Sequence, residues 1–526
     1  MGRINKIIHY LLVVTYNLSL GLLLAGCQTN TSIIPIDIES VASPKGTEVF
    51  QPNWENIAQN YQFPEWFADA KFGIFIHWGV TTIPAFGLSW YPRFMYEKGT
   101  SDYEHHVATW GDPSEFGYKD FIPMWKAEKY DPAQWAALFK AAGAKYVVPV
   151  GEYVDGFSNY DSDLNEWNVV KMGPKKDVIG MLKAALEKEG LIFGMSTHRA
   201  ENAWFFGSGL DIPSDVNDMT IGLYGGRLAY ETYSDSIAKE WLARTYEMVN
   251  KYQPQLMWFD WTVNMPVLLP YFNKFLAYYY NCALDWNKQV VVNAKYGFPV
   301  DILVWDMERG KSNKLMKYPW QTDTSIGKKS WHYIDGEENK SPKQIVQDFV
   351  DIVSKNGNLL LNIGPRADGT ITEEQTFILL AIGKWLKTNG EAIYGTRPWK
   401  KFGEGETNVI VGAHSDSNTT QYTAQDIRFT TKGNDFYATA LEWCDTTTVV
   451  KSLNKNAIAD ARILNVSMLG SDEKIKWKQS DEGLILSFPK IRPCEFAYTF
   501  KISFDKKVGE HLPSEASEET MRYLNY

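Results

Sequence analysis

Short apolar stretches alternate with longer amphipathic stretches along the chain from about residue 65 to residue 395. The apolar stretches are too short for helices and are rich in aliphatic and aromatic residues, which indicates buried strands. The predicted strands cover residues 71–78, 145–150, 192–198, 256–260, 290–294, 302–307, 330–334 and 358–363.

The stretches between these strands carry apolar residues at helical spacing, as over residues 132–142, 178–189, 236–251 and 341–355. The last of these has Ser341 before a proline at its start and Gly357 just past its end, both typical helix boundaries. Alternation of strands and helices predicts a parallel sheet, and about eight such units predict a closed barrel.

The pattern changes after about residue 400, where short alternating runs are separated by polar turns. These runs cover residues 409–411, 426–430, 435–441, 463–468, 483–487 and 497–502. Their spacing predicts an antiparallel β-sandwich. The expected fold is therefore α/β: a (β/α)8 TIM-like barrel over residues 49–398, then a C-terminal antiparallel β-sandwich over residues 399–506 and a charged tail over residues 507–526.

The N-terminus has the pattern of a targeting segment. Arg3 and Lys6 precede an apolar region over residues 7–24, and the sequence Leu-Ala-Gly-Cys ends at Cys27. Residues 1–27 resemble a bacterial lipoprotein signal, with Cys27 as the lipidated residue, and residues 28–48 form a polar tether. An ordinary secretory signal with an incidental cysteine is the alternative. The expected location is extracytoplasmic and lipid-anchored, in the periplasm or on the outer-membrane surface of a Gram-negative bacterium.

Composition narrows the functional class. A chain of 526 residues exceeds the usual size of a single core, so one large and one small domain are expected. The net charge of −10 argues against a nucleic-acid partner, whereas 20 Trp, 29 Tyr and 27 Phe suit a site that stacks on sugar rings. Cys282, Cys444 and Cys494 match no zinc spacing and are predicted to be buried thiols, and no metal or cofactor is expected.

Asp260 directly follows the short apolar run at residues 256–259. A carboxylate at the end of a buried strand is costly to bury, so it is expected to open onto a site. Catalytic groups of a barrel lie at the C-terminal ends of its strands. A helix N-cap is the alternative role for an isolated aspartate.

His77 and Trp78 end the first predicted strand. An imidazole there can hydrogen-bond a sugar hydroxyl while the indole packs against an apolar sugar face. A hydrogen-bonded core histidine is the alternative.

The sequence over residues 72–79, Phe-Gly-Ile-Phe-Ile-His-Trp-Gly, closely resembles the first-strand signature of the α-L-fucosidases of glycoside hydrolase family 29. Similar segments follow in the family's order, and the resemblance extends from about residue 66 to residue 399. They lie at residues 89–93, 121–123, 145–148, 358–365, 368–369 and 390–399. The chain is identified from them as a member of that family.

The resemblance implies that Asp260 is the nucleophile of a retaining glycosidase. Such an enzyme needs a second carboxyl group to protonate the leaving oxygen and then activate water. Glu308, near the end of the sixth predicted strand, is the preferred candidate, with Glu201 and Asp323 as rivals. Part of the family places this group further downstream, where Gln321 stands here, and an amide cannot protonate a leaving group. A structural ion pair with an arginine is the alternative role for Glu308.

One departure from the family concerns sugar binding. The family usually carries His-His-Asp-Gly-Phe after the second strand, whereas this chain has Tyr153 and Val154 before Asp155. Loss of those imidazoles is expected to weaken discrimination between sugars. The His198-Arg199-Ala200-Glu201 segment after the third strand could replace the lost contacts, and a helix-start role is the alternative for Glu201.

The resulting hypothesis is a retaining, exo-acting α-L-glycosidase that removes terminal α-L-fucose or α-L-galactose from an extracytoplasmic glycan. A non-catalytic carbohydrate-binding lipoprotein is the competing class, and a hydrolase acting within a chain is a third possibility. The oligomeric state stays open. Residues expected to contact the sugar are His77, Trp90, Tyr153, Asp155, His198, Glu201, Trp258 and Arg309.

Overall fold

The computed structural model describes residues 46, 48–407, 410–416, 420–458 and 460–508. The predicted signal peptide with Cys27, most of the tether and most of the charged tail lie outside the described residues. Within the described part of the chain, no helix is long and apolar enough to cross a membrane.

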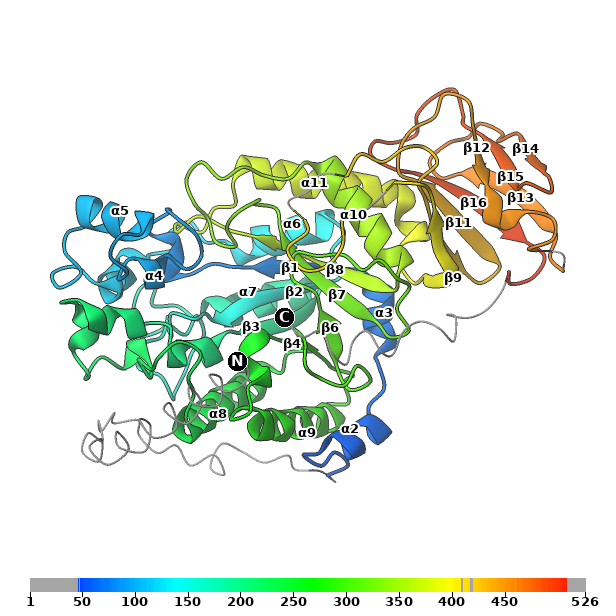
Figure 1. Cartoon of the computed structure of the whole chain (residues 1–526). Helices are drawn as coiled ribbons and strands as arrows, with labels where there is room; N and C mark the ends of the chain where they lie inside the picture. Colours follow the sequence, from blue (N-terminus) through cyan, green and yellow to red (C-terminus); the bar gives the residue numbers. More distant parts are fainter. Residues whose placement is uncertain (1–45, 47, 408–409, 417–419, 459, 509–526) are drawn as a thin grey trace, which may run out of the picture. The chain divides into compact units, whose positions relative to one another are not determined.

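Eight parallel strands close into a barrel in chain order, and β8 pairs with β1 to complete it. The predicted barrel is thus confirmed, with the strands in its centre and helices around them (Figure 1). The strands are β1 (Phe72–Ile76), β2 (Tyr146–Glu152), β3 (Ile192–Thr197), β4 (Leu256–Phe259), β5 (Val291–Ala294), β6 (Val304–Asp306), β7 (Trp320–Ser325) and β8 (Gly357–Ile363).

The seventh strand was predicted in the wrong place. Residues 330–334 lie in a loop, and the strand is β7 instead. This strand has no apolar run, because its buried polar side chains find partners inside the barrel. The Tyr146 hydroxyl donates to Gln321 Oε1 at 2.7 Å, and Thr322 Oγ1 donates to the carbonyl of Met307 at 2.6 Å. A hydrophobic pattern does not detect a strand that is buried through hydrogen bonds.

The helices between the strands match the predicted ones within one or two residues. At the start of α10, Ser341 accepts a hydrogen bond from the backbone N–H of Gln344 at 3.1 Å, and Pro342 occupies the first turn. The α-helices are α2 (Trp54–Asn60), α3 (Glu65–Ala70), α4 (Tyr91–Phe94), α5 (Ser101–Thr109), α6 (Pro132–Ala141), α7 (Val178–Lys188), α8 (Asp235–Tyr252), α9 (Leu269–Asp285), α10 (Pro342–Ser354) and α11 (Glu373–Asn389).

The C-terminal part is an antiparallel β-sandwich, as predicted. One sheet has the order β13-β16-β11-β10-β9 and the other has the order β12-β15-β14. The run predicted at residues 409–411 is not a strand at residues 410 and 411, and residue 409 lies outside the described part. The strands are β9 (Arg397–Glu404), β10 (Ile427–Lys432), β11 (Asp435–Ala440), β12 (Thr447–Val450), β13 (Ile463–Met468), β14 (Trp477–Gln479), β15 (Leu484–Ser487) and β16 (Tyr498–Phe504).

Helix α10 of the barrel joins the sandwich through a buried ion network. Asp351 accepts from Lys355 Nζ at 2.6 Å and from Arg428 Nε, on β10, at 2.5 Å. All three side chains are almost fully buried, so each charge depends on its partners. The network ties the sandwich to the barrel wall.

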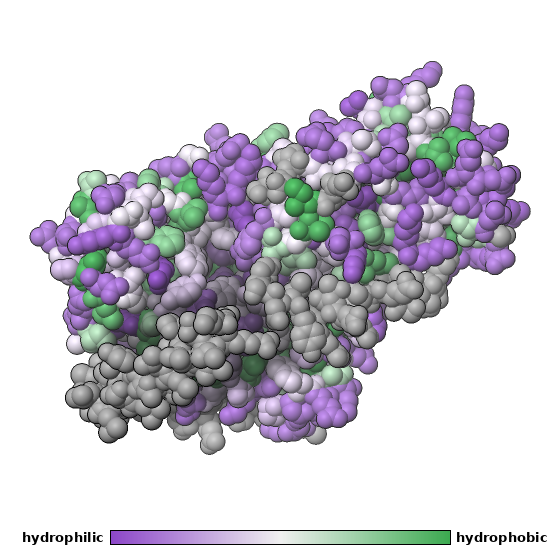
Figure 2. Space-filling view, viewed as in Figure 1, coloured by the Kyte–Doolittle hydropathy of each residue, from purple (hydrophilic) through white to green (hydrophobic). Residues whose placement is uncertain are grey.

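The surface carries mostly hydrophilic side chains on the visible face, with hydrophobic residues in small groups (Figure 2). Such scattered groups are ordinary for a folded protein. Among the cysteines, Cys282 is buried as predicted, but Cys444 and Cys494 are only half-buried. Both lie at the edge of the sandwich core, packed against it.

Candidate active site

Asp260 stands at the C-terminal end of β4, where the chain turns into the short 3₁₀ helix η8 (Trp261–Asn264). One carboxylate oxygen accepts the backbone N–H of Trp261 at 2.9 Å, so the N-cap role is met. The other lies 3.0 Å from Nδ1 of His198, just past β3. The side chain is one-fifth exposed, and it therefore reaches the surface of a pocket.

The surroundings of Asp260 favour its ionised form. Burial acts to raise its pKa, but the hydrogen bond with His198 and the positive charge of Lys295 outweigh burial and hold the pKa below its ordinary value. An ionised carboxylate held in one orientation is the state required of a nucleophile.

Glu308 lies two residues past β6, and its side chain is about one-quarter exposed. Its Oε2 is 3.2 Å from Nζ of Lys295, so the ion pair is made with a lysine and not with the arginine that the alternative role required. Burial raises the pKa of Glu308 above its ordinary value, although Lys295 opposes that effect. Glu308 is therefore the more easily protonated of the two strand-end carboxyl groups.

Lys295 is one of the site residues that were not predicted from the sequence. It directly follows β5, and its Nζ lies 3.1 Å and 3.2 Å from the two carboxylate oxygens of Asp323 as well as close to Glu308. The same nitrogen stands 4.9 Å from the ring centre of Trp258, a cation–π distance. Its position at a strand end, like that of Asp260, was the signal that could have found it.

A pocket of about 290 Å³ opens at these strand ends and is called the inner pocket. It brings together both predicted catalytic residues, both rival carboxyl groups and six of the eight predicted sugar contacts. Its lining is His77, Trp90, Tyr153, Val154, His198, Glu201, Trp258, Asp260, Trp261, Lys295, Glu308, Asp323, Trp331 and His414.

His77 is both hydrogen-bonded and part of the inner pocket. Its Nδ1 lies 2.7 Å from Oδ1 of Asn362 on β8. Burial, with the nearby His332 and His198, lowers the pKa of His77 well below its ordinary value, so the ring is neutral. The neighbouring Trp78 was expected to pack against a sugar, but this was wrong. Its indole lies in an aromatic cluster outside the inner pocket and donates to the carbonyl of Arg366 at 2.8 Å.

Imidazoles from other parts of the barrel surround Tyr153, which stands where the family usually has a histidine. The Tyr153 ring lies 5.8 Å from that of His77, 5.2 Å from that of His198 and 4.6 Å from that of His332. His332 belongs to the loop after β7 and was not anticipated. Burial lowers the pKa of His332 to about 3, so it adds a neutral polar group behind Tyr153.

Glu201 is fully buried on the 3₁₀ helix η4 (Arg199–Ala203), with its carboxyl group in the inner pocket wall. One oxygen accepts the Thr262 hydroxyl at 2.7 Å, and the other finds no hydrogen-bond partner within the described residues. Burial and the charge of Asp260 raise the pKa of Glu201 well above its ordinary value. Glu201 therefore binds a proton more readily than the neighbouring Asp260.

Two predicted sugar contacts do not line the inner pocket. Asp155 accepts the Tyr118 hydroxyl at 2.5 Å and the backbone N–H of Phe157 at 3.0 Å, and burial raises its pKa to about 6. The Arg309 guanidinium donates to the carbonyls of Lys328 and Gly327 at 3.1 Å and 3.0 Å. Both groups are occupied within the protein, which corrects their assignment as residues of this pocket.

Gln321 and Arg199 are likewise committed to internal contacts. The Gln321 side chain is buried in the barrel, where its Nε2 donates to Asp306 at 2.5 Å. Arg199 donates to both oxygens of Glu240 at 3.0 Å and to Asn202 Oδ1 at 2.7 Å. Arg199 thus fixes the loop that carries His198 and Glu201 and does not itself line the pocket.

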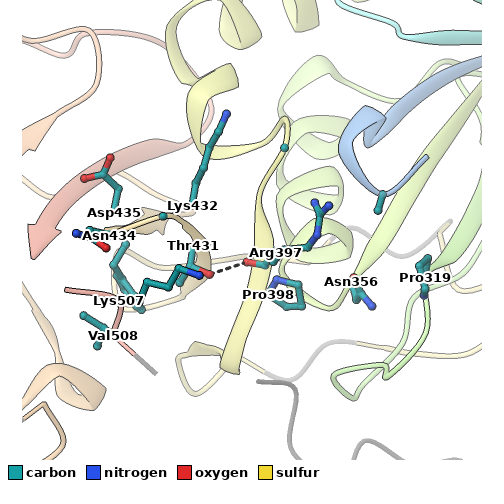
Figure 3. Close-up of a pocket in the computed structure, with 14 residues that line it drawn as sticks. Pro319, Asn356, Arg397, Pro398, Thr431, Lys432, Asn434, Asp435, Lys507 and Val508 are labelled. Carbon is teal, nitrogen blue, oxygen red and sulfur yellow. Dashed lines mark hydrogen bonds between the residues drawn. The ribbon is translucent and has the colours of Figure 1, made fainter. Parts of the chain in front are cut away.

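Two further pockets help to define the site. An outer pocket of about 320 Å³ adjoins the inner one and shares Trp261, Lys295, Glu308 and His414 with it. A larger pocket, about 620 Å³, shares no lining residue with either. It lies around β9 and the turn between β10 and β11, where the carbonyl of Arg397 accepts the Thr431 hydroxyl at 3.2 Å (Figure 3). The volume of a pocket alone therefore does not identify the candidate active site.

A family model described as alpha-L-fucosidase matches residues 38–391, and one described as alpha-L-fucosidase C-terminal domain matches residues 419–503. The chain belongs to the α-L-fucosidase family. Human tissue alpha-L-fucosidase is 32% identical over 478 residues, which cover 88% of this chain and 94% of the relative. The family makes the chain a glycoside hydrolase of the α-L-fucosidase type.

Solved structures of the same family agree with the fold. Thermotoga maritima alpha-fucosidase in complex with fucose superposes with a TM-score of 0.69 at 31% identity, covering 86% of this chain and all 100% of that one. The same enzyme in complex with a mechanism-based inhibitor gives a TM-score of 0.70 at 30% identity and the same coverage. The barrel and the C-terminal sandwich are therefore a shared family architecture.

Proposed function

We propose that this protein is a retaining, exo-acting α-L-glycosidase that removes a terminal α-L-fucose or α-L-galactose by double displacement. The observation that carries the proposal is the pair Asp260 and Glu308. The two carboxyl groups line one pocket, and their pKa values are displaced in opposite directions. In such a pair, the carboxyl group with the lowered pKa can act as the nucleophile and the one with the raised pKa can act as the general acid.

In the first step, an ionised Asp260 oxygen attacks the anomeric carbon, and the bond between that carbon and the leaving oxygen breaks. Glu308 gives its proton to the leaving oxygen, so the departing sugar leaves as a neutral alcohol. The hydrogen bonds from His198 and from the backbone N–H of Trp261 hold the attacking carboxylate in place. The product of this step is a glycosyl ester on Asp260.

In the second step, Glu308 acts as a base. It takes a proton from water, the water oxygen attacks the anomeric carbon, and the ester bond to Asp260 breaks. Lys295 lies 3.2 Å from Glu308 and lowers the pKa of both carboxyl groups, so it limits how strongly each binds a proton. Two inversions at the anomeric carbon give net retention.

Glu308 is preferred over Glu201 and Asp323 as the acid/base because of its position. Glu308 lines both the inner and the outer pocket, whereas Glu201 and Asp323 line only the inner one. The oxygen that is protonated joins the terminal sugar to the leaving group, so the proton donor belongs at the boundary between them. Asp323 is in addition paired through both oxygens with Lys295.

The choice between L-fucose and L-galactose depends on the walls of the inner pocket. L-Galactose carries a hydroxyl on C6 that L-fucose lacks, so it needs extra room and a polar partner. Tyr153 and Val154 replace the family's imidazoles, and Glu201 offers a buried oxygen without a partner among the described residues. A hydrogen-bonding group of this kind can separate two sugars that differ by one hydroxyl.

The experiment follows hydrolysis of an aryl α-L-fucoside and the matching aryl α-L-galactoside by proton NMR. We expect the α-anomer of the sugar to form first, and we expect the galactoside to be cleaved at a rate at least comparable with the fucoside. First formation of the β-anomer would refute the retaining mechanism. Robust cleavage of the fucoside alone would refute the shifted sugar preference.

The alternative, a non-catalytic carbohydrate-binding protein, predicts a different result in the same samples. Saturable binding of α-L-fucosides with no release of sugar from any of them would favour it. The two carboxyl groups with divided pKa values count against it, because binding alone requires no such pair.

We also propose that the protein acts outside the cytoplasm and is anchored through a lipid on Cys27. The support is the sequence pattern of residues 1–27, which lie outside the described residues. Metabolic labelling with a fatty acid is expected to label the unmodified protein and not the Cys27→Ser variant. Equal labelling of both would remove the proposal.

A further inference from the structure

The segment over residues 410–416 returns from the sandwich to the active site. It belongs to the connection between β9 and β10, two strands of the sandwich, yet its His414 lines both the inner and the outer pocket. The other described residues of the inner pocket lining lie between positions 77 and 331, within the barrel. His414 is thus the lining residue that the C-terminal part of the chain supplies.

Backbone hydrogen bonds hold this segment against the chain that carries Glu308. The N–H of His414 donates to the carbonyl of Glu308 at 3.0 Å, and the N–H of Asp416 donates to the carbonyl of Arg309 at 3.0 Å. In addition, the N–H of Arg309 donates to the carbonyl of Asp323, on β7, at 2.7 Å. The backbone around the proposed acid/base is therefore fixed by β7 and by the segment together.

The close approach of the two stretches requires a glycine at position 310. A Cβ atom at Gly310 would lie 2.3 Å from the carbonyl oxygen of Gly412, well inside van der Waals contact. The N–H of Gly412 donates to the carbonyl of Lys311 at 3.0 Å, within an isolated antiparallel bridge. The chain that follows Glu308 thus leaves room for the segment to lie directly beside it.

Asp416 fastens the segment to the barrel. Its carboxylate accepts from Lys340 Nζ at 2.5 Å, from Thr324 Oγ1 at 2.5 Å and from Arg309 at 3.3 Å. Asp416, Lys340 and Arg309 are all buried, so each of these charges depends on its partners. The segment is consequently held in one position relative to the barrel.

Two residues of this contact have left-handed backbone conformations. The angle φ is 55° at His414 and 46° at Arg309, in a region that residues other than glycine seldom adopt. Such conformations persist where the surrounding structure enforces them, and they cluster at functional sites. Here the enforcement comes from the backbone hydrogen bonds and from the buried carboxylate of Asp416.

The His414 imidazole is exposed at the boundary of the two pockets, so it contributes little to the packing of the core. Glu308 lines the same two pockets, and its Oε2 lies 3.2 Å from Nζ of Lys295. The positive charge of a protonated His414 lowers the pKa of Glu308, as expected for two side chains that share one boundary.

We propose that residues 410–416 complete the active site and that His414 is a positioning residue for Glu308. The segment fixes the backbone of Glu308, and the imidazole, together with Lys295, holds its carboxyl group in the orientation that transfers a proton to the leaving oxygen. This inference rests on the proposed function, because it requires Glu308 to be the acid/base. Catalysis by the barrel then depends on a connection within the C-terminal sandwich.

The test compares His414→Ala with the unmodified protein on two substrates that share the preferred α-L-sugar. A phenyl glycoside has a poor leaving group and needs the proton of Glu308, whereas a dinitrophenyl glycoside has a good leaving group and departs without it. Misplacement of a reacting group by about 1 Å can cost roughly 10²-fold. We expect kcat/KM for the phenyl glycoside to fall by about tenfold and that for the dinitrophenyl glycoside to change by less than about twofold.

A second measurement asks whether His414 acts through Glu308. His414→Ala is combined with Glu308→Gln, and the phenyl glycoside is assayed again. Residues that work as one unit have non-additive effects, so we expect the double variant to stay within about twofold of Glu308→Gln. His105→Ala, outside the lining of both pockets, is the matched control and is expected to change neither substrate's kcat/KM. Circular dichroism and thermal unfolding check that every variant is folded.

Each remaining result counts against the inference. Equal losses on the two glycosides, no loss on either, or losses that multiply in the double variant would overturn the positioning role while leaving the glycosidase function intact. Unfolding of His414→Ala would give the imidazole a structural role and would overturn the inference as well. Failure of the unmodified protein to cleave any α-L-fucoside or α-L-galactoside would refute the proposed function and, with it, the role of His414.

Discussion

The ends of β4 and β6 and the end of β2 face the same pocket but differ in how closely they follow the family. The first two ends present Asp260 and Glu308, which match the positions that the resemblance gives to the nucleophile and the acid/base. The end of β2 presents Tyr153 and Val154 where the family usually has two histidines. The carboxyl groups proposed to carry out the reaction thus follow the family, while the residues at the end of β2, proposed to recognise the sugar, differ from it.

The difference has a physical basis. A nucleophile and a general acid must be carboxyl groups at fixed positions with divided pKa values, so few replacements are tolerated. A hydroxyl of the sugar can be bound by any polar group that reaches it, and such groups can come from several strand ends. His198 and His332 lie around Tyr153 and show that imidazoles from other elements have gathered at the altered position.

Removal of the nucleophile is expected to have the largest effect. Asp260→Asn keeps the shape of the side chain but cannot attack the anomeric carbon, so kcat for an aryl glycoside should fall by about 10⁴-fold or more. Added azide should restore part of the rate and give a glycosyl azide of inverted configuration. Asp472→Asn, in an exposed loop of the sandwich, is the matched control. Near-normal turnover by Asp260→Asn would refute the assignment of Asp260 as the nucleophile.

The next largest effect is expected for Glu308→Gln, and it should depend on the leaving group. Protonation matters most when the departing oxygen is basic, and general acid catalysis supplies about 10²–10⁴-fold. We expect a loss in that range on an alkyl or sugar leaving group and a much smaller loss on an activated aryl glycoside. Glu201→Gln is the comparison variant from the same pocket. If Glu201→Gln showed the leaving-group dependence and Glu308→Gln did not, the acid/base role would belong to Glu201 and not to Glu308.

A smaller effect is expected when the altered region is returned to the family pattern. The double variant Tyr153→His, Val154→His should raise the ratio of kcat/KM for the aryl α-L-fucoside to that for the α-L-galactoside. A single net hydrogen bond contributes about 1 kcal/mol, so the ratio should change by roughly fivefold or more. If the double variant cleaves both aryl glycosides and the ratio is unchanged, the sugar preference is set elsewhere in the pocket.

The smallest expected effect is on the pH profile of kcat/KM. His198 helps to hold the pKa of Asp260 below its ordinary value, so loss of the imidazole should raise that pKa. The acidic limb, where Asp260 becomes protonated and activity is lost, should then move to higher pH in His198→Phe. The alkaline limb, where Glu308 loses its proton, should stay in place. His105→Phe, outside the pocket lining, is the control, and a shift of the alkaline limb alone would contradict the account.

The sequence was sufficient to predict the barrel, the sandwich and the position of Asp260 at a strand end facing a pocket, because these depend on local patterns. Buried strands have apolar runs, and a carboxylate directly after such a run is conspicuous. β7 was misplaced because Gln321 and Thr322 are buried through hydrogen bonds and not through apolar surface. A hydrophobic pattern in the sequence does not identify the hydrogen-bond partners of buried polar side chains.

The rest of the site depends on contacts between distant segments. Lys295 could have been found from its position after a predicted strand, but its pairing with Asp323 could not. Arg309 and Asp155 were misassigned because position in a motif does not reveal which way a side chain points. His414 comes from a segment beyond the barrel, and only the folded chain brings it beside Glu308.

The most direct test of the central claim is to trap the covalent intermediate. The protein is incubated with a 2-deoxy-2-fluoro-α-L-fucosyl fluoride, and the labelled peptide is identified by mass spectrometry. The account predicts one added sugar per active site, carried by Asp260 in the peptide that follows β4, and no label on the Asp260→Asn variant. A label on Glu201, Asp323 or any other carboxyl group, or turnover with inverted product and no label, would contradict it.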